Sequence, residues 1–360
     1  MKRTRDIQLD FIRVIATFFV MSVHFFLKTG FYKHEISGMS ILAPLIFRTL
    51  FMTCVPLFIV LSGFLLYYRK ITVKHFLSLR KVLLQYFLCA IFLFAFDSIM
   101  GWRTISFKAF AENILSFGQY SWYVKKYILL FLIMPFINLF FRENESNKIR
   151  RAFLVVLMAI VLIPSTLELA GGGTGLFGIL LKVSDKLYPA LYYSVGVYYF
   201  YNKKKLLENY SSKFLLWTLI GVLAISSIVS YKRYIGGVYL WENWNSYNGI
   251  FVFLCATILF LLLMKVNLSK MKASMAGKII ELFSQTSFYI YLLSYIFDNI
   301  YYSLFADIPI LNRMKYPVIP LLVFLSAFIL GMLVDKIYKK ISEKIDFVVD
   351  KIQVKANIKQ

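Results

Sequence analysis

The chain has 360 residues, of which 60% are hydrophobic and 18% aromatic, and its formal net charge is +23. A water-soluble domain of this length needs a largely polar surface, so the composition excludes a soluble globular protein and indicates a chain surrounded by lipid. The positive charge would suggest nucleic-acid binding in a soluble protein, but its distribution along the chain favours another explanation.

Ten long apolar segments follow one another along the chain. Each approaches the ~20 residues that a helix needs to cross ~30 Å of hydrocarbon. Lipid offers no hydrogen bonds to the backbone, and helices satisfy their own, so these segments predict helices. The predicted fold class is all-α, a polytopic membrane protein with about ten transmembrane helices. The predicted spans are residues 9–27, 41–68, 82–100, 120–141, 152–170, 187–201, 214–231, 247–264, 280–305 and 317–334.

Basic residues concentrate in every second connection and at both ends of the chain. Connections rich in lysine and arginine stay on the cytoplasmic side of a membrane, so both termini are predicted to be cytoplasmic. The chain is therefore predicted to be a multi-pass protein of the cell membrane, with a bacterial cytoplasmic membrane favoured, and its basic face suits anionic lipid headgroups. The basic segments are residues 2–5, 69–81, 142–151, 203–213, 265–278 and the tail from residue 336.

Domain organisation follows from the same pattern. The longest segment outside the spans is the tail, so residues 1–338 are predicted to form one transmembrane domain. In the tail, residues 339–360, apolar residues recur near helical spacing with lysines between them. This pattern predicts a basic amphipathic helix on the inner leaflet.

The first span contains ionisable residues that lipid does not tolerate without a partner or a cavity. Asp10 and Arg13 are three residues apart and can pair on the helix surface. His24 follows Arg13 by eleven residues, which leaves an angular offset of only ~20° over a rise of ~16 Å. We therefore predict that Arg13 and His24 face the same cavity, with Arg13 near the cytoplasm and His24 deeper in the membrane.

This arrangement suits a reaction between a cytoplasmic anionic donor and an acceptor from the other side. A buried neutral imidazole can take a proton from a hydroxyl, and a guanidinium can bind phosphate with two hydrogen bonds. A structural alternative stays open, in which His24 bonds a neighbouring carbonyl and Arg13 extends to the interface. His34 and His75 fall in connections predicted on opposite sides, so no metal site is predicted.

Motifs across the chain resemble those of the membrane acyltransferase-3 family, in which a basic residue precedes a histidine by the spacing seen between Arg13 and His24. Residues 55–58 (VPLF) and 61–65 (LSGFL) are similar to the family's VPLFF and SGFLL signature. Other similarities are Leu9-Asp10 in the first span, Arg48 in the second, Arg80 before the third, Trp122-Tyr123 and Pro135 in the fourth, Tyr193 and Gly196 in the sixth, and Tyr247 and Phe260 in the eighth.

The resemblance implies a membrane O-acyltransferase. It would move an acyl group, with acetyl favoured, from cytoplasmic acyl-CoA (acetyl-CoA) to a hydroxyl of a cell-envelope polysaccharide or lipid-linked glycan precursor. His24 would be the catalytic base or part of an acyl relay, Arg13 would serve catalysis and donor binding, and Arg80 would bind the donor. Partners would be the donor, the glycan and membrane lipids, without metal or nucleic acid. The substrate cavity is expected to contain Asp10, Arg48, Ser62, Trp122, Tyr123 and Ser294.

One departure and two alternatives accompany this resemblance. In the ninth span, Ser294 stands where relatives commonly have a second histidine. A polysaccharide exporter or translocator of the same fold is one alternative, since a buried arginine and histidine can line a sugar or proton path. The second is a catalytically inactive sensor or scaffold.

Several side chains near the outer membrane boundary have ordinary explanations. Arg48 either contacts the acceptor or forms an ion pair. The aromatic residues Trp122 and Tyr123 can stack on sugars, but the bilayer interface also favours them. The acidic residues Glu112, Glu168 and Asp298 are interpreted as solvated residues at loop ends.

Overall fold

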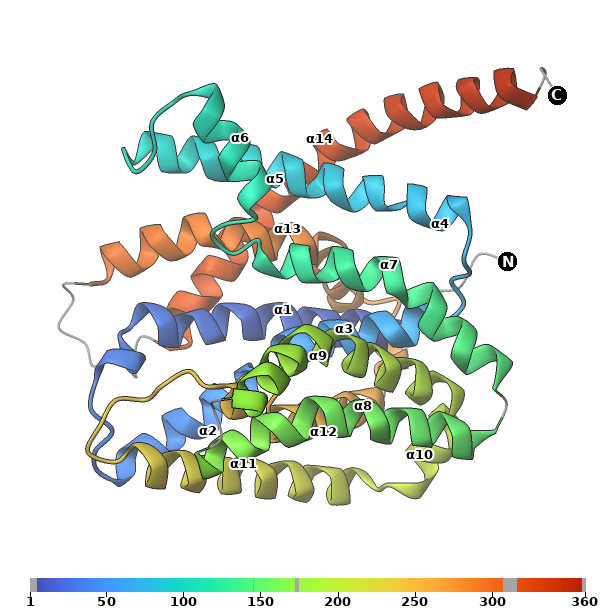
Figure 1. Ribbon diagram of the computed structural model, residues 1–360. Coiled ribbons are helices and arrows are strands. Elements are labelled where there is room, and N and C mark those ends of the chain that lie inside the picture. Colours follow the sequence, from blue (N-terminus) through green and yellow to red (C-terminus); the bar gives the residue numbers. More distant parts are fainter. Residues whose placement is uncertain (1–4, 145, 172–174, 307–315, 358–360) are drawn as a thin grey trace.

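The computed structural model describes residues 5–144, 146–171, 175–306 and 316–357. The described part consists of helices and connections without a β-strand, which confirms the predicted all-α class (Figure 1). The α-helices are α1 (Ile7–Lys28), α2 (Leu42–Phe51), α3 (Cys54–Leu66), α4 (Val73–Leu77), α5 (Leu79–Ile99), α6 (Phe107–Ser116), α7 (Trp122–Glu143), α8 (Asn147–Leu167), α9 (Gly175–Tyr201), α10 (Lys203–Asn209), α11 (Ser212–Tyr234), α12 (Ile250–Met264), α13 (Met275–Leu304) and α14 (Val318–Asn357). Short 3-10 turns are η1 (Phe31–Lys33), η2 (Met39–Ile41), η3 (Glu168–Ala170), η4 (Asn243–Asn245) and η5 (Ser269–Met271).

Eight helical segments among the described residues are long and apolar enough to cross a membrane. Every predicted span overlaps a helix, but α9 and α13 are not among these eight. Both are rich in tyrosine and polar residues, and both lie inside the bundle, where α9 packs on α3 and α13 packs on α1. The count of ten spans therefore stays a prediction.

The second predicted span, residues 41–68, is two helices rather than one. α2 ends at Phe51 and α3 begins at Cys54. Pro56 explains the break, because its ring has no N–H to donate and would clash with the carbonyl of Met52 in a continuous helix. At the break, the Thr53 N–H and hydroxyl both donate to the Leu50 carbonyl, at 3.1 and 2.6 Å.

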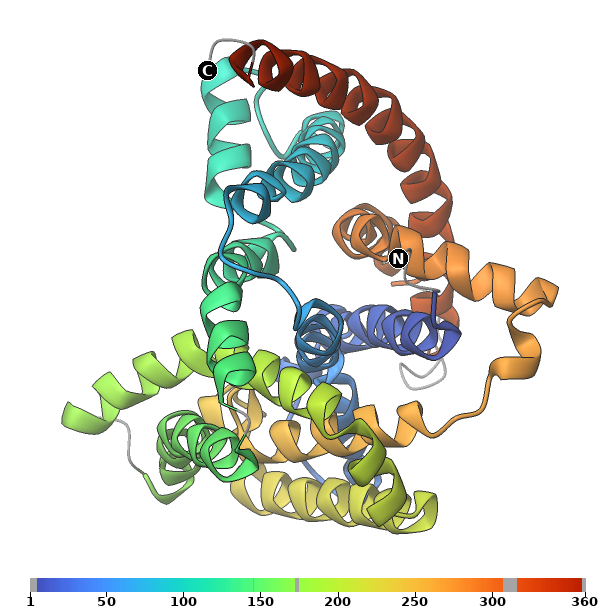
Figure 2. The same cartoon turned by 90° about the vertical axis from the view of Figure 1, so that its right-hand side faces the viewer.

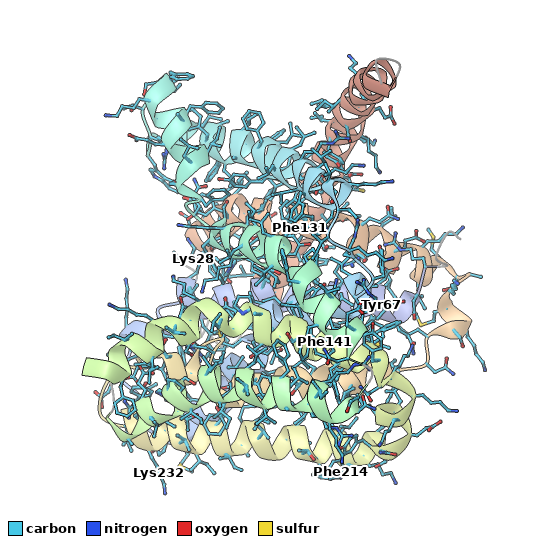
Figure 3. The ribbon with its side chains drawn as sticks, turned by 45° about the vertical axis from the view of Figure 1, so that its right-hand side comes forward. Lys28, Tyr67, Phe131, Phe141, Phe214 and Lys232 are labelled. Atoms are coloured by element: carbon cyan, nitrogen blue, oxygen red, sulfur yellow. The ribbon has the colours of Figure 1, made fainter. Side chains whose placement is uncertain are left out.

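The two ends of the bundle hold different segments of the chain. The start of α1 lies at the same end as α10 and the end of α14, and the α6 segment lies toward the opposite end (Figure 1). Figure 3 places Lys28 and Lys232 at one edge, with Tyr67 and Phe214 displaced toward the other. α14 continues through residue 339 to Asn357 without a break, so the predicted tail is continuous with the last span.

Helices α1 and α13 form the centre of the molecule, and they run parallel and in register. The Ser284 hydroxyl donates to Asp10 at 2.6 Å, and the His24 ring contacts Asp298 at 3.0 Å. Both pairs are separated by the same 274 positions, so the two helices advance together for fourteen residues, or ~21 Å. The view in Figure 2 shows α1 surrounded by α3, α12 and α13.

A second close contact joins α3 to α9 through two glycines. A Cβ on Gly63 would lie 2.1 Å from the Tyr193 carbonyl oxygen, and a Cβ on Gly196 would lie 2.0 Å from that of Val60. Small residues at such crossings let helix backbones approach each other in membranes. The glycine of the SGF motif therefore serves helix packing.

Substitution of Gly196 by alanine is expected to destabilise the protein by roughly 1–3 kcal/mol or more, because the added methyl group overlaps backbone atoms that cannot move aside cheaply. Thermal unfolding of the detergent-purified full-length chain measures the effect. Gly221→Ala in α11 is the matched control, since no atom lies within 4 Å of its would-be Cβ. Equal melting temperatures for the two variants would contradict this role for the crossing.

Candidate functional site

The pair of His24 and Asp298 is the central feature of the candidate site. His24 Nδ1 lies 3.0 Å from Asp298 Oδ2, and the two residues are 6% and 0% exposed. A carboxylate at Nδ1 holds the proton on that nitrogen and leaves the lone pair on Nε2. Among the described residues, no hydrogen bond to Nε2 accompanies the contact at Nδ1. This arrangement prepares His24 to accept a proton.

Asp298 is the functional residue that the sequence interpretation assigned wrongly. It was expected to be a solvated residue at a loop end, but it is fully buried within α13. Glu112, by contrast, is exposed as expected. A signal was present in the sequence, because Ser284, Ser287, Tyr291 and Asp298 recur at helical spacing and form a polar stripe along one face of the helix.

The N-terminal end of α1 carries a second polar cluster. Asp10 accepts hydrogen bonds from Arg5 Nε at 2.6 Å and from the Ser284 hydroxyl at 2.6 Å. Arg13 Nη1 donates to the Ser284 hydroxyl at 2.9 Å and lies 3.7 Å from Asp10 Oδ1. This confirms the predicted contact of Asp10 with Arg13 and adds Ser284, which sequence spacing could not reveal. Asp10 is only 5% exposed, so these partners compensate a buried carboxylate.

A central cavity of ≈ 240 Å³ lies beside this cluster. Its polar lining groups come from five helices, and Val20, Val55, Val82 and Phe288 complete an apolar wall. Such a mixture of apolar walls and a few polar groups is typical of ligand cavities. The polar and aromatic lining residues are Arg13, Phe58, Ser62, Gln85, Tyr123, Tyr127, Ser287 and Tyr291.

His24 does not line this cavity, contrary to the prediction that it shares one with Arg13. The separation has a physical cause in two tyrosines. The Tyr120 ring covers the His24 imidazole with a centroid distance of 3.9 Å. The Tyr291 hydroxyl, from the cavity wall, donates to the Tyr120 carbonyl. Tyr291 and Tyr120 therefore link the cavity that Arg13 lines to the buried ring of His24.

The residues predicted to line the substrate cavity divide into two groups. Ser62 and Tyr123 do line it, whereas Asp10, Arg48, Trp122 and Ser294 do not. The Trp122 ring stacks on Tyr247 at 5.6 Å, and the buried Ser294 hydroxyl donates to the carbonyl of Tyr291 within its own helix. Ser294 precedes Asp298 by one helical turn, so Asp298 occupies the face on which relatives commonly have histidine.

Arg48 joins segments that are far apart in the chain. Its guanidinium is 0% exposed and is surrounded by the rings of Tyr32, Tyr239 and Trp241, at 5.9, 4.9 and 5.1 Å from their centroids. It donates to the Tyr32 hydroxyl at 3.1 Å and to both the backbone and side-chain oxygens of Asn245. No carboxylate pairs with it among the described residues, so cation–π contacts and neutral acceptors replace the predicted ion pair.

Arg80 lies in the first turn of α5, two residues before Val82 of the cavity wall. This places it at the same end of α5 as the cavity. In the part of the chain that the structure describes, no group of three histidine, cysteine, aspartate or glutamate side chains could hold a metal ion.

Comparison with known proteins identifies the family. The family model described as an acyltransferase domain matches residues 6–335. Proteins of Staphylococcus aureus strains MSSA476, MW2 and MRSA252, each named a probable poly-beta-1,6-N-acetyl-D-glucosamine export protein, are 25% identical over 364 residues and are matched along 95% of their length, against 94% of this chain. No solved structure matches. Because the family model spans nearly the whole chain, the protein belongs to the membrane acyltransferase-3 family.

Proposed function

We propose that this protein transfers an acyl group, with acetyl favoured, from cytoplasmic acyl-CoA to a hydroxyl of a cell-envelope glycan or its lipid-linked precursor. Membership of an acyltransferase family supports acyl transfer as the reaction class. The observation that carries the proposal is the buried contact of His24 Nδ1 with Asp298 at 3.0 Å, while Nε2 makes no hydrogen bond to a described residue. An imidazole oriented in this way is the usual general base for activating a hydroxyl.

The chemistry assigns one role to each partner of this pair. His24 Nε2 takes the proton of the acceptor hydroxyl as the oxygen attacks the thioester carbonyl. The carbon–sulfur bond then breaks, the new ester forms, and the proton on His24 passes to the CoA thiolate that leaves. Asp298 does not touch the reacting atoms. It is a positioning residue that fixes the imidazole tautomer and stabilises the transient imidazolium.

The donor end of the site is assigned to Arg13. The hydrogen bond to Ser284 and the contact with Asp10 fix its guanidinium in the wall of the central cavity. A guanidinium held in this way binds phosphate oxygens well, and acyl-CoA carries several phosphates. Arg80 at the same end of α5 is a second candidate contact for the donor. The relatives named for poly-beta-1,6-N-acetyl-D-glucosamine export support a glycan as the acceptor class.

Replacement of Asp298 by asparagine is expected to lower kcat by about 10²–10⁴-fold with a smaller effect on KM for acyl-CoA, because the imidazole loses its tautomer control. His24→Ala is expected to abolish transfer. The measurement is acceptor acylation from labelled acetyl-CoA by purified protein. His34→Ala is the matched control, since His34 is exposed and distant from Asp298 in the chain. Full activity in His24→Ala would contradict the proposed mechanism.

Arg13→Ala is expected to weaken CoA binding about tenfold or more, because a charge-assisted contact worth ~1.5–3 kcal/mol is lost. His24→Ala should leave CoA binding almost unchanged, since His24 lies outside the central cavity. Isothermal titration with CoA measures both variants, with Arg151→Ala on the exposed start of α8 as the control. An equal loss of affinity in Arg13→Ala and His24→Ala would refute this division of roles.

Glycan export is the second candidate function, and the names of the relatives favour it. The polar residues between α1 and α13 could line a path for sugar or protons instead of a catalytic site. The two functions predict different glycans on the surface of cells that lack the protein. Under acyl transfer, mass spectrometry should find the glycan at the surface without one acyl mass. Absence of the glycan itself from the surface would favour export.

A further inference from the structure

One aromatic side chain covers the proposed base. The Tyr120 ring lies over the His24 imidazole with centroids 3.9 Å apart and planes inclined by 38°. Tyr120 belongs to no helix, since it lies in the connection of residues 117–121 between α6 and α7. Groups on connections move more readily than groups on packed helices, and many enzymes use them to admit substrate and exclude water.

The backbone of this connection has an uncommon conformation. Phe117 and Gln119 have φ angles of 50° and 53°, in the left-handed region that side chains disfavour. Contacts on both sides compensate this strain. The Phe117 ring stacks on Tyr86 at 4.7 Å, and the Gln119 amide donates to Asp97. These contacts hold the connection in place just before Tyr120. Tyr120 follows directly and lies over His24.

Tyr120 itself is held by few polar contacts. Its hydroxyl lies beside the Asp298 carboxylate without a well-aligned hydrogen bond among the described residues. Its carbonyl accepts a hydrogen bond from the Tyr291 hydroxyl. The Tyr291 side chain is also part of the wall of the central cavity, together with Arg13. The same phenol therefore contacts the cavity assigned to the donor and the residue that covers the base.

We propose that Tyr120 is a lid over His24 and that Tyr291 is its latch, so that a ligand in the central cavity controls access to His24. This inference rests on the proposed function for the identity of the ligand, a coenzyme A thioester. A donor that fills the cavity displaces the Tyr291 phenol from the Tyr120 carbonyl, and the freed lid exposes the base to the acceptor. The base stays covered while the donor is absent, which limits wasteful transfer to water.

Histidine carbethoxylation tests the lid without any acyl transfer. The chain has three histidines, so diethyl pyrocarbonate labelling of the full-length protein in detergent can be followed at each by mass spectrometry. His34 is exposed and serves as the fast standard. His75 is 2% exposed and stacks on Phe131, so it serves as the slow standard.

Tyr291→Phe is expected to raise the labelling rate of His24 about fivefold, which is the effect of one ordinary hydrogen bond on an opening equilibrium. Tyr120→Ala should raise it further, with His75 unchanged in both variants. Tyr301→Phe is the matched control on the same helix, because its hydroxyl contacts Ser326 at 2.7 Å away from the lid. An unchanged His24 rate in Tyr291→Phe, or a parallel rise at His75, overturns the latch.

Added CoA tests the coupling to the cavity. It should raise His24 labelling in the wild-type protein and produce little further increase in Tyr291→Phe. Binding of CoA is measured on the same samples by titration. Binding without a rise in labelling overturns the coupling, whereas absence of binding overturns the donor assignment on which the coupling rests. The labelling of Tyr291→Phe without CoA tests the lid itself in either case.

Discussion

The need to compensate ionisable groups inside a bilayer determines how α1 and α13 associate. His24 and Asp298 pair toward one end of the interface, and Asp10, Arg13 and Ser284 pair toward the other. A charged group left unpaired at membrane depth costs several kcal/mol. Two such contacts ~21 Å apart fix both the rotation and the axial register of the two helices. The alignment also sets the positions of Arg13 beside the central cavity and of the buried His24.

Neighbouring residues of one family motif serve different purposes, one in the cavity wall and one in helix packing. In the SGF motif, Ser62 lines the central cavity, whereas Gly63 permits the backbone of α3 to approach that of α9. Arg48, which seemed suited to a substrate, is enclosed by aromatic rings. Some motif residues therefore hold the helices together around the site, and others line its cavity. The burial of each side chain distinguishes the two kinds.

Sequence reasoning predicted the features that depend on local composition. The lengths of apolar segments predicted the helices, and the pair Asp10 and Arg13 could be inferred because both lie on one helix. The partner of His24 could not be inferred, because the contact joins residues 274 positions apart and depends on how α13 packs. The shared cavity of Arg13 and His24 was predicted from helical geometry alone. The geometry of the first helix says nothing about Tyr120 and Tyr291, which come from other segments and lie between the cavity and His24.

The parallel alignment of α1 and α13 also has a consequence for biogenesis. The ribosome completes α1 long before the residues that neutralise it exist, since Asp298 follows His24 by 274 positions. At translation rates of ~5–20 residues per second, this delay is on the order of tens of seconds. During that interval the first helix carries His24 without its carboxylate partner, next to the insertion machinery. Final assembly must therefore wait for one of the last helices, and truncated chains are expected to be substrates for membrane quality control.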